Sequence, residues 1–138
     1  MFLRYNIPGI LWAIIILILL GLPGSDLPDT SFINIPHFDK IVHAGLFGIL
    51  VFLLARGFCM QHQFEYLRKY FVLLSLLLSI CYGGLTEILQ GTVFPERTSD
   101  IFDFIFDVAG CAIGIFFFLY YKKKFLIAKV AEIQKYKS

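Results

Sequence analysis

The chain has 138 residues, of which 59% are hydrophobic and 16% are charged, and its formal net charge is +2. Soluble domains carry about 25% charged residues, so this composition excludes an ordinary soluble protein. The length allows one domain, and no nucleic-acid partner is expected. The sequence therefore predicts an integral membrane protein.

Four apolar runs come close to the roughly 20 residues that a helix needs to cross the hydrocarbon layer of a bilayer. In chain order they cover about residues 7–22, 41–58, 70–90 and 101–121. The first run resembles the apolar core of a signal peptide, but no A-x-A-like cleavage site follows it, so we interpret it as an uncleaved anchor. The predicted fold is all-α, a polytopic bundle of four transmembrane helices.

Basic residues divide unevenly between the two sides that four spans define. The side with both termini and the middle loop holds ten of them: Arg4, Arg56, Arg68, Lys69, Lys122, Lys123, Lys124, Lys129, Lys135 and Lys137. The other side has only Lys40 and Arg97. Loops that stay in the cytoplasm are enriched in Lys and Arg. Both termini are therefore predicted to be cytoplasmic, with residues 1–124 forming the transmembrane domain and residues 125–138 a short basic tail.

Eight of the ten acidic residues lie on the opposite, outer side, and five of these eight surround the connection between the third and fourth spans. Glu87 and Gln90 are three residues apart near the end of the third span. Asp100, Asp103 and Asp107 are spaced i, i+3, i+7 at the start of the fourth. Each set follows one face of its helix. These side chains are expected to face another helix rather than lipid.

The second span also begins on the outer side, where Asp39 and His43 are spaced i, i+4. His43, Glu87, Asp103 and Asp107 therefore come from three helices into one outer half of the membrane. A charged side chain at the centre of a bilayer costs roughly 2.5–3.5 kcal/mol on insertion scales, and such residues normally face a cavity or a partner. The four residues form a candidate site.

A purely structural interpretation is open for part of this group. Lys40 and Arg97 would then neutralise acids near the helix ends, and Asp100 would cap the fourth helix through its N-terminal amides. Gly110 and Gly114 form a small-xxx-small pair that lets another helix approach closely.

Three segments carry a resemblance to a known family. The segments are DKIVHAGLFGIL (39–50), TEILQ (86–90) and ERTSDIFDFIFDVAGCAIG (96–114). With their order on four spans, they resemble the VanZ-like family of small bacterial membrane proteins over about residues 36–114. Carried over position by position, the family's polar signature falls on Asp39, Lys40, His43, Glu87, Gln90, Arg97, Asp100, Asp103, Gly110 and Gly114. Where the family commonly has Asn, this chain has Asp107.

The resemblance implies a multi-pass protein of the bacterial cytoplasmic membrane that acts at the outer leaflet. The name-giving member is associated with low-level resistance to the glycopeptide antibiotic teicoplanin. Expected partners are a membrane lipid or a cell-wall precursor.

Three kinds of function remain open. In a binding protein, the polar residues would form an outer pocket for a lipid-linked precursor, a lipid headgroup or a glycopeptide. In a hydrolase or transferase, the catalytic residues would be His43, Glu87 and Asp103, and the substrate would be bound by Lys40, Gln90, Arg97, Asp100 and Asp107. In an assembly partner, the polar layer would only fix helix register.

No cofactor is predicted, although one imidazole and several carboxylates are suitable ligands for a divalent metal. An outward-open cavity lined by His43, Glu87 and Asp103 would favour the first two functions. Pairing of these side chains without a cavity would favour the third.

Overall fold

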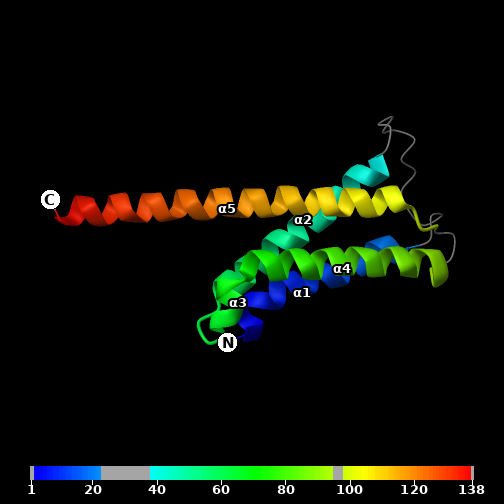
Figure 1. The fold of residues 1–138 in the computed structure, drawn as a ribbon, viewed down its shortest axis with the longest axis horizontal. Helices are drawn as coiled ribbons and strands as arrows, with labels where there is room; N and C mark the ends of the chain where they lie inside the picture. The colour runs from blue at the N-terminus through cyan, green and yellow to red at the C-terminus, as the bar shows by residue number, and fades with distance from the viewer. Residues whose placement is uncertain (1, 23–37, 95–97, 138) are drawn as a thin grey trace.

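The computed structural model describes residues 2–22, 38–94 and 98–137, with side chains described as far as Phe125. These residues contain helices and no strand (Figure 1): α1 Phe2–Gly21, α2 Phe38–Cys59, α3 Glu65–Lys69, α4 Phe71–Thr92 and α5 Ile101–Lys137. Four helical segments, α1, α2, α4 and Ile101–Phe125 of α5, are long and apolar enough to cross a membrane. The predicted all-α architecture with four spans is confirmed.

The helices extend beyond the apolar runs that predict them. α1 begins at Phe2 rather than at residue 7, and α2 begins at Phe38 rather than at residue 41. The short helix α3 lies in the segment predicted as the middle loop. α5 continues to Lys137 without a break, because no Gly or Pro follows Gly114 to stop it.

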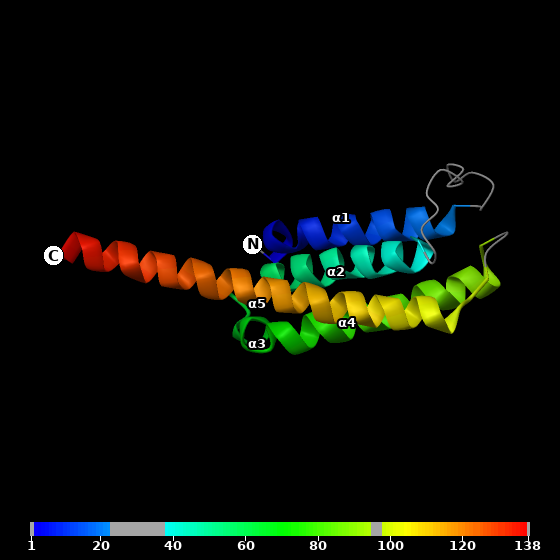
Figure 2. The same cartoon turned by 90° about the horizontal axis from the view of Figure 1, so that it is seen from above.

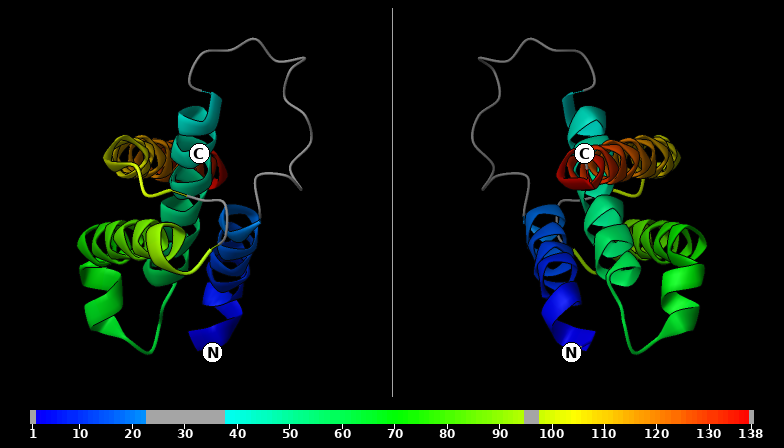
Figure 3. Two further views of the ribbon diagram at one scale, coloured as in Figure 1. Left: turned by 90° about the vertical axis from the view of Figure 1, so that its right-hand side faces the viewer. Right: turned by 90° about the vertical axis from the view of Figure 1, so that its left-hand side faces the viewer.

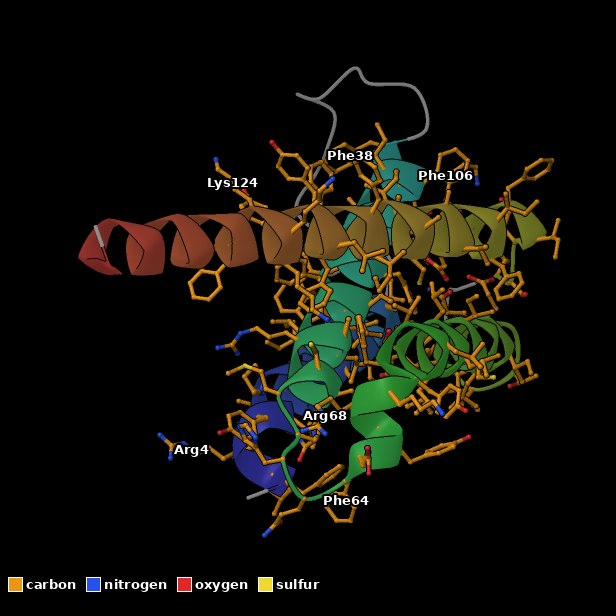
Figure 4. The ribbon with its side chains drawn as sticks, turned by 60° about the vertical axis from the view of Figure 1, so that its left-hand side comes forward. Arg4, Phe38, Phe64, Arg68, Phe106 and Lys124 are labelled. Carbon is orange, nitrogen blue, oxygen red and sulfur yellow. The ribbon has the colours of Figure 1, made fainter. Side chains whose placement is uncertain are left out.

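The spans form a splayed bundle with both chain termini at the same end (Figures 1 and 2). The end of α1, the start of α2, the end of α4 and the start of α5 meet at the opposite end, which we call the loop end. Viewed end-on, α2 is steeply inclined to α4 and α5 (Figure 3). In Figure 4, Arg4 and Arg68 lie at the terminal end and Phe38 lies at the start of α2.

α2 is the central helix, because most of the contacts between the spans involve it, above all those with α5. The buried core combines apolar side chains of three helices: Ile16, Leu20, Leu46, Phe47, Leu50, Val51, Ala55, Cys111, Ile115 and Phe118. α4 buries small hydroxyl side chains instead, and those of Ser75 and Thr86 donate to carbonyl oxygens of their own helix. The fold thereby brings the polar residues of α2, α4 and α5 to one end of a shared core.

Small residues bring α2 and α5 into backbone contact. A Cβ atom on Gly110 would collide with the backbone of Ala44, and one on Gly114 would collide with the carbonyl oxygen of Gly48. Backbone atoms cannot move aside as a flexible side chain can, so these positions require Gly. The prediction that Gly110 and Gly114 permit a close helix approach is confirmed.

Aromatic side chains with polar tips attach α1 to the bundle. Trp12 Nε1 donates to the carbonyl oxygen of Leu46 at 2.9 Å, and the Tyr82 hydroxyl donates to that of Ala13 at 2.6 Å. These bonds join α1 to α2 and to α4. α1 is thus an integral part of the packed structure.

Candidate functional site

A polar cluster lies at the loop end, and its position on α5 is set by a helix cap. Asp100 Oδ1 accepts a hydrogen bond from the backbone N–H of Phe102 at 2.9 Å, and the carbonyl oxygen of Asp100 accepts one from Asp103. Asp100 is therefore the N-cap of α5, as predicted. The cap fixes the residue at which α5 begins, and therefore the helix face on which Asp103 and Asp107 lie.

Lys40 joins α2 to the start of α5. Its Nζ donates to Asp100 Oδ2 and to Asp103 Oδ1, each at 2.8 Å. The side chains of Lys40 and Asp103 are 16% and 10% exposed, whereas that of Asp100 is 40% exposed. The Lys40 ammonium, followed by the Phe102 N–H, holds the pKa of Asp100 below its usual range. Lys40 therefore neutralises acids at the helix entry, which the structural interpretation of the sequence predicted.

One helical turn deeper, His43 of α2 pairs with Asp107 of α5. His43 Nδ1 lies 2.9 Å from Asp107 Oδ1, and the two side chains are 1% and 0% exposed. This contact is within hydrogen-bonding distance and fully screened from solvent. Two successive polar pairs thus connect α2 with α5.

Glu87 comes from α4 and completes the cluster. Its Oε2 accepts hydrogen bonds from the backbone N–H of Asp100 at 3.0 Å and from the Ser99 hydroxyl at 3.3 Å. The other oxygen, Oε1, is buried and has no hydrogen-bond partner among the described residues. Asp107 Oδ2 is likewise buried without a hydrogen-bond partner among the described residues. Buried polar atoms without a partner are rare in native structures, so these two oxygens need an explanation.

The buried members of the cluster lie close enough together to hold one metal ion. His43, Glu87 and Asp107 each offer a ligand atom within 4.8 Å of the other two, and all three residues are buried. A second group, Asp39, His43 and Asp103, satisfies the same criterion, but Asp39 is exposed. The clusters share His43.

The predicted site residues divide into three groups by position. Six of them meet at the loop end: Lys40, His43, Glu87, Asp100, Asp103 and Asp107. Gln90 is buried, and its amide donates to the carbonyl oxygen of Leu20 at 3.3 Å, so it holds α1. Arg97 lies outside the described residues. The sequence did not predict the contact of Ser99 with Glu87, because an uncharged side chain next to Asp100 has no distinctive pattern.

Directly beside the polar cluster lies an apolar crevice of about 280 Å³ between α2 and α5. Its lining is Ala44, Gly45, Gly48, Ile49, Phe52, Gly110, Ile113, Gly114 and Phe117. The crevice begins at the residue after His43 on α2 and one turn after Asp107 on α5. It is not the polar cavity lined by His43, Glu87 and Asp103 that the sequence considered, because none of those residues lines it.

Fold and composition together define a small integral membrane protein with four spans and a cluster of polar side chains at one end. The family model described as VanZ/LLP1 matches residues 9–122, which is most of the chain. The chain therefore belongs to the VanZ/LLP1 family, and the resemblance found in the sequence is confirmed. Neither the curated proteins nor the solved structures gave a match.

Proposed function

We propose that this protein binds a lipid-anchored component of the bacterial cell envelope at the outer leaflet of the cytoplasmic membrane. The polar headgroup would contact the loop end, and the hydrocarbon chain would lie in the crevice between α2 and α5. One observation carries the proposal: the polar cluster and the apolar crevice follow each other along the same pair of helices, since the crevice begins at the residue after His43 and one turn after Asp107. An amphipathic ligand needs this combination.

The upper pair of the cluster is the part that a headgroup can reach. Asp100 is 40% exposed and Lys40 is 16% exposed at its side chain. Among the described residues at this end, the five acids Asp39, Glu87, Asp100, Asp103 and Asp107 face a single Lys, Lys40. This charge balance repels a bare phosphate and favours a headgroup with amino or hydroxyl groups. The ligand class we favour is therefore an envelope lipid with such a headgroup.

Two features favour binding over the alternatives. A hydrolase or transferase would need a base that contacts the substrate, but His43 is 1% exposed and Asp103 is bound to Lys40. A packing function would leave the crevice beside the contact of α2 with α5 without any role. Ligand binding accounts for the exposed upper pair and for the crevice.

Filling the crevice tests the proposal. A Cβ atom on Gly45 meets nothing within 4 Å, so Gly45→Leu places bulk in the crevice without disturbing the backbone contact of α2 with α5. The control is Leu78→Phe, because Leu78 is 52% exposed on α4 and does not line the crevice. Both variants and the wild type are purified in a mild detergent, and their bound lipids are identified by native mass spectrometry.

The wild type and Leu78→Phe should retain one lipid class enriched over its share in the source membrane, and Gly45→Leu should lose most of that enrichment. The headgroup mass distinguishes a phospholipid from a sugar-bearing precursor. A wild type that carries lipids only in their bulk proportions would overturn the proposal, and so would equal enrichment in Gly45→Leu.

A further inference from the structure

We infer that His43, Glu87 and Asp107 form a binding site for one divalent transition-metal cation, such as Mn²⁺ or Zn²⁺. The site is built by three different helices, α2, α4 and α5. It lies beneath the Lys40 pair and does not include the crevice. The inference therefore stands independently of the proposed lipid function.

The three side chains are already close to the spacing that an ion requires. Their ligand atoms lie within 4.8 Å of one another. Protein ligands lie about 2.1 Å from Zn²⁺, so two of them in a tetrahedral site are roughly 3.4 Å apart. Side-chain movements below about 1 Å would close the site around an ion.

Each of the two carboxylates has one oxygen in hydrogen bonds and a second oxygen that is buried without a described partner. Glu87 Oε2 is occupied by the Asp100 N–H and the Ser99 hydroxyl, whereas Oε1 has no partner in the part of the chain that the structure describes. Asp107 Oδ1 is occupied by His43, whereas Oδ2 has no partner among the described residues. Orientation of ligands by outer hydrogen bonds is characteristic of metal centres. We therefore assign the second oxygen of each carboxylate as its ligand atom for the ion.

Charge also favours a cation at this position. Glu87 and Asp107 are 6% and 0% exposed on helices that are apolar enough to span a membrane. Burial of ionised carboxylates is costly unless they are paired or coordinate a metal. The described ammonium at this end, Lys40, is used by Asp100 and Asp103. A divalent cation would neutralise both remaining carboxylates.

The donor set points to the class of metal. Carboxylate oxygen suits Mg²⁺, Ca²⁺ and Mn²⁺, whereas imidazole nitrogen suits Zn²⁺ and other transition metals. One nitrogen and two oxygens together favour a first-row transition metal. The alternative group with Asp39 is weaker, because Asp39 is exposed and Asp103 already accepts from Lys40.

The test uses the full chain in detergent, stripped of metal with a chelator and without added lipid. Mn²⁺ binding is measured by electron paramagnetic resonance, and Zn²⁺ binding by displacement of Mn²⁺. The wild type should bind one equivalent, with nitrogen hyperfine coupling from the imidazole of His43. Glu87→Gln and Asp107→Asn keep side-chain shape and should each lower the affinity by about tenfold or more.

Asp39→Asn is the matched control, since it removes an exposed acid at the same end and should bind Mn²⁺ like the wild type. Helicity and elution volume confirm that each variant is folded. If one of the two variants does not fold, the other still tests the site. Absence of Mn²⁺ and Zn²⁺ binding in the wild type, or equal loss in Asp39→Asn, would overturn the inference. Loss of lipid enrichment alone would affect only the proposed function.

Discussion

At the scale of single residues, Lys40 organises the entry to the polar cluster. Its ammonium contacts the carboxylates of Asp100 and Asp103, at the start and the end of the first turn of α5. It also lies 5.7 Å from the centre of the Phe102 ring. The aliphatic stem of a lysine can pass along apolar surface while its charged end stays at the interface. Lys40 thus connects α2 to the capped start of α5.

Asp100 makes the stability of this end depend on pH. Lys40, and then the Phe102 N–H, lower the pKa of Asp100 from its usual value of 3.8. A carboxyl group whose pKa is lower in the folded than in the unfolded protein stabilises the fold. This stabilisation is complete at a pH above the pKa of the unfolded state, and it is lost as the pH falls through the pKa of the folded state. The wild type should therefore lose thermal stability on acidification below about pH 4.

Asp100→Asn should show a smaller acid-induced decrease in Tm, because an amide still caps the helix but does not titrate. The measurement is the unfolding temperature in detergent over a pH series, with Asp39→Asn as the control at an exposed position of the same end. Identical acid sensitivity of the wild type and Asp100→Asn would show that the Lys40 pair does not contribute.

The sequence predicted which residues gather, but not which of them pair. Helical spacing placed Asp103 and Asp107 on one face, and the hydropathy pattern placed His43 at a similar depth. The pairing of Lys40 with Asp103 and of His43 with Asp107 depends on how α2 and α5 are rotated and inclined. Periodicity carries no information about that relative rotation.

At the scale of elements, the contact between α2 and α5 determines where the cluster and the crevice lie. Gly48, Gly110 and Gly114 allow the two backbones to touch, and the same small residues leave the crevice open on one side. The Gly110–Gly114 pair was visible in the sequence. The crevice was not, because it also needs Gly45 and Gly48 of the other helix in register.

Gly110→Ala should separate α2 from α5, whereas Gly45→Ala should not. The added Cβ at position 110 collides with the backbone of Ala44, but at position 45 it meets nothing within 4 Å. Overpacking typically costs about 1–3 kcal/mol, whereas Gly→Ala in an unobstructed helix stabilises by about 0.5–1 kcal/mol. Denaturant titration in detergent micelles measures both effects. Equal stability of the two variants would contradict this account of the helix contact.

The lengths of the elements were less predictable than their number. Apolar composition identifies the four spans. The ends of a helix depend instead on hydrogen-bond partners for its terminal backbone groups and on helix-breaking residues. α2 includes Asp39 and Lys40 in its first turn, and α5 continues through the basic segment that follows Tyr121. A window of apolar residues cannot detect either extension. α3 is a single short turn of helix, and no pattern in its five residues predicted it.

At the scale of the whole molecule, charge divides between the two ends of the bundle. Among the residues whose side chains are described, the terminal end has seven basic residues: Arg4, Arg56, Arg68, Lys69, Lys122, Lys123 and Lys124. The described part of the loop end has Lys40 and five acids. The bundle places both termini at the basic end (Figures 1 and 2). This separation is the physical basis for assigning the two faces of the membrane.

We therefore predict that both termini are cytoplasmic and that the loop end faces outward, since short basic segments are retained in the cytoplasm. A reporter that fluoresces only in the cytoplasm should be active when fused after Ser138, and a phosphatase that folds only outside it should be inactive there. Ser99 is exposed at the loop end, so Ser99→Cys in a chain without other cysteines should react with a membrane-impermeant maleimide added outside cells. The opposite result in both assays would place the loop end in the cytoplasm. Outer-leaflet lipid binding would then be rejected, whereas the cation site of His43, Glu87 and Asp107 would remain, because its chemistry does not depend on the side of the membrane.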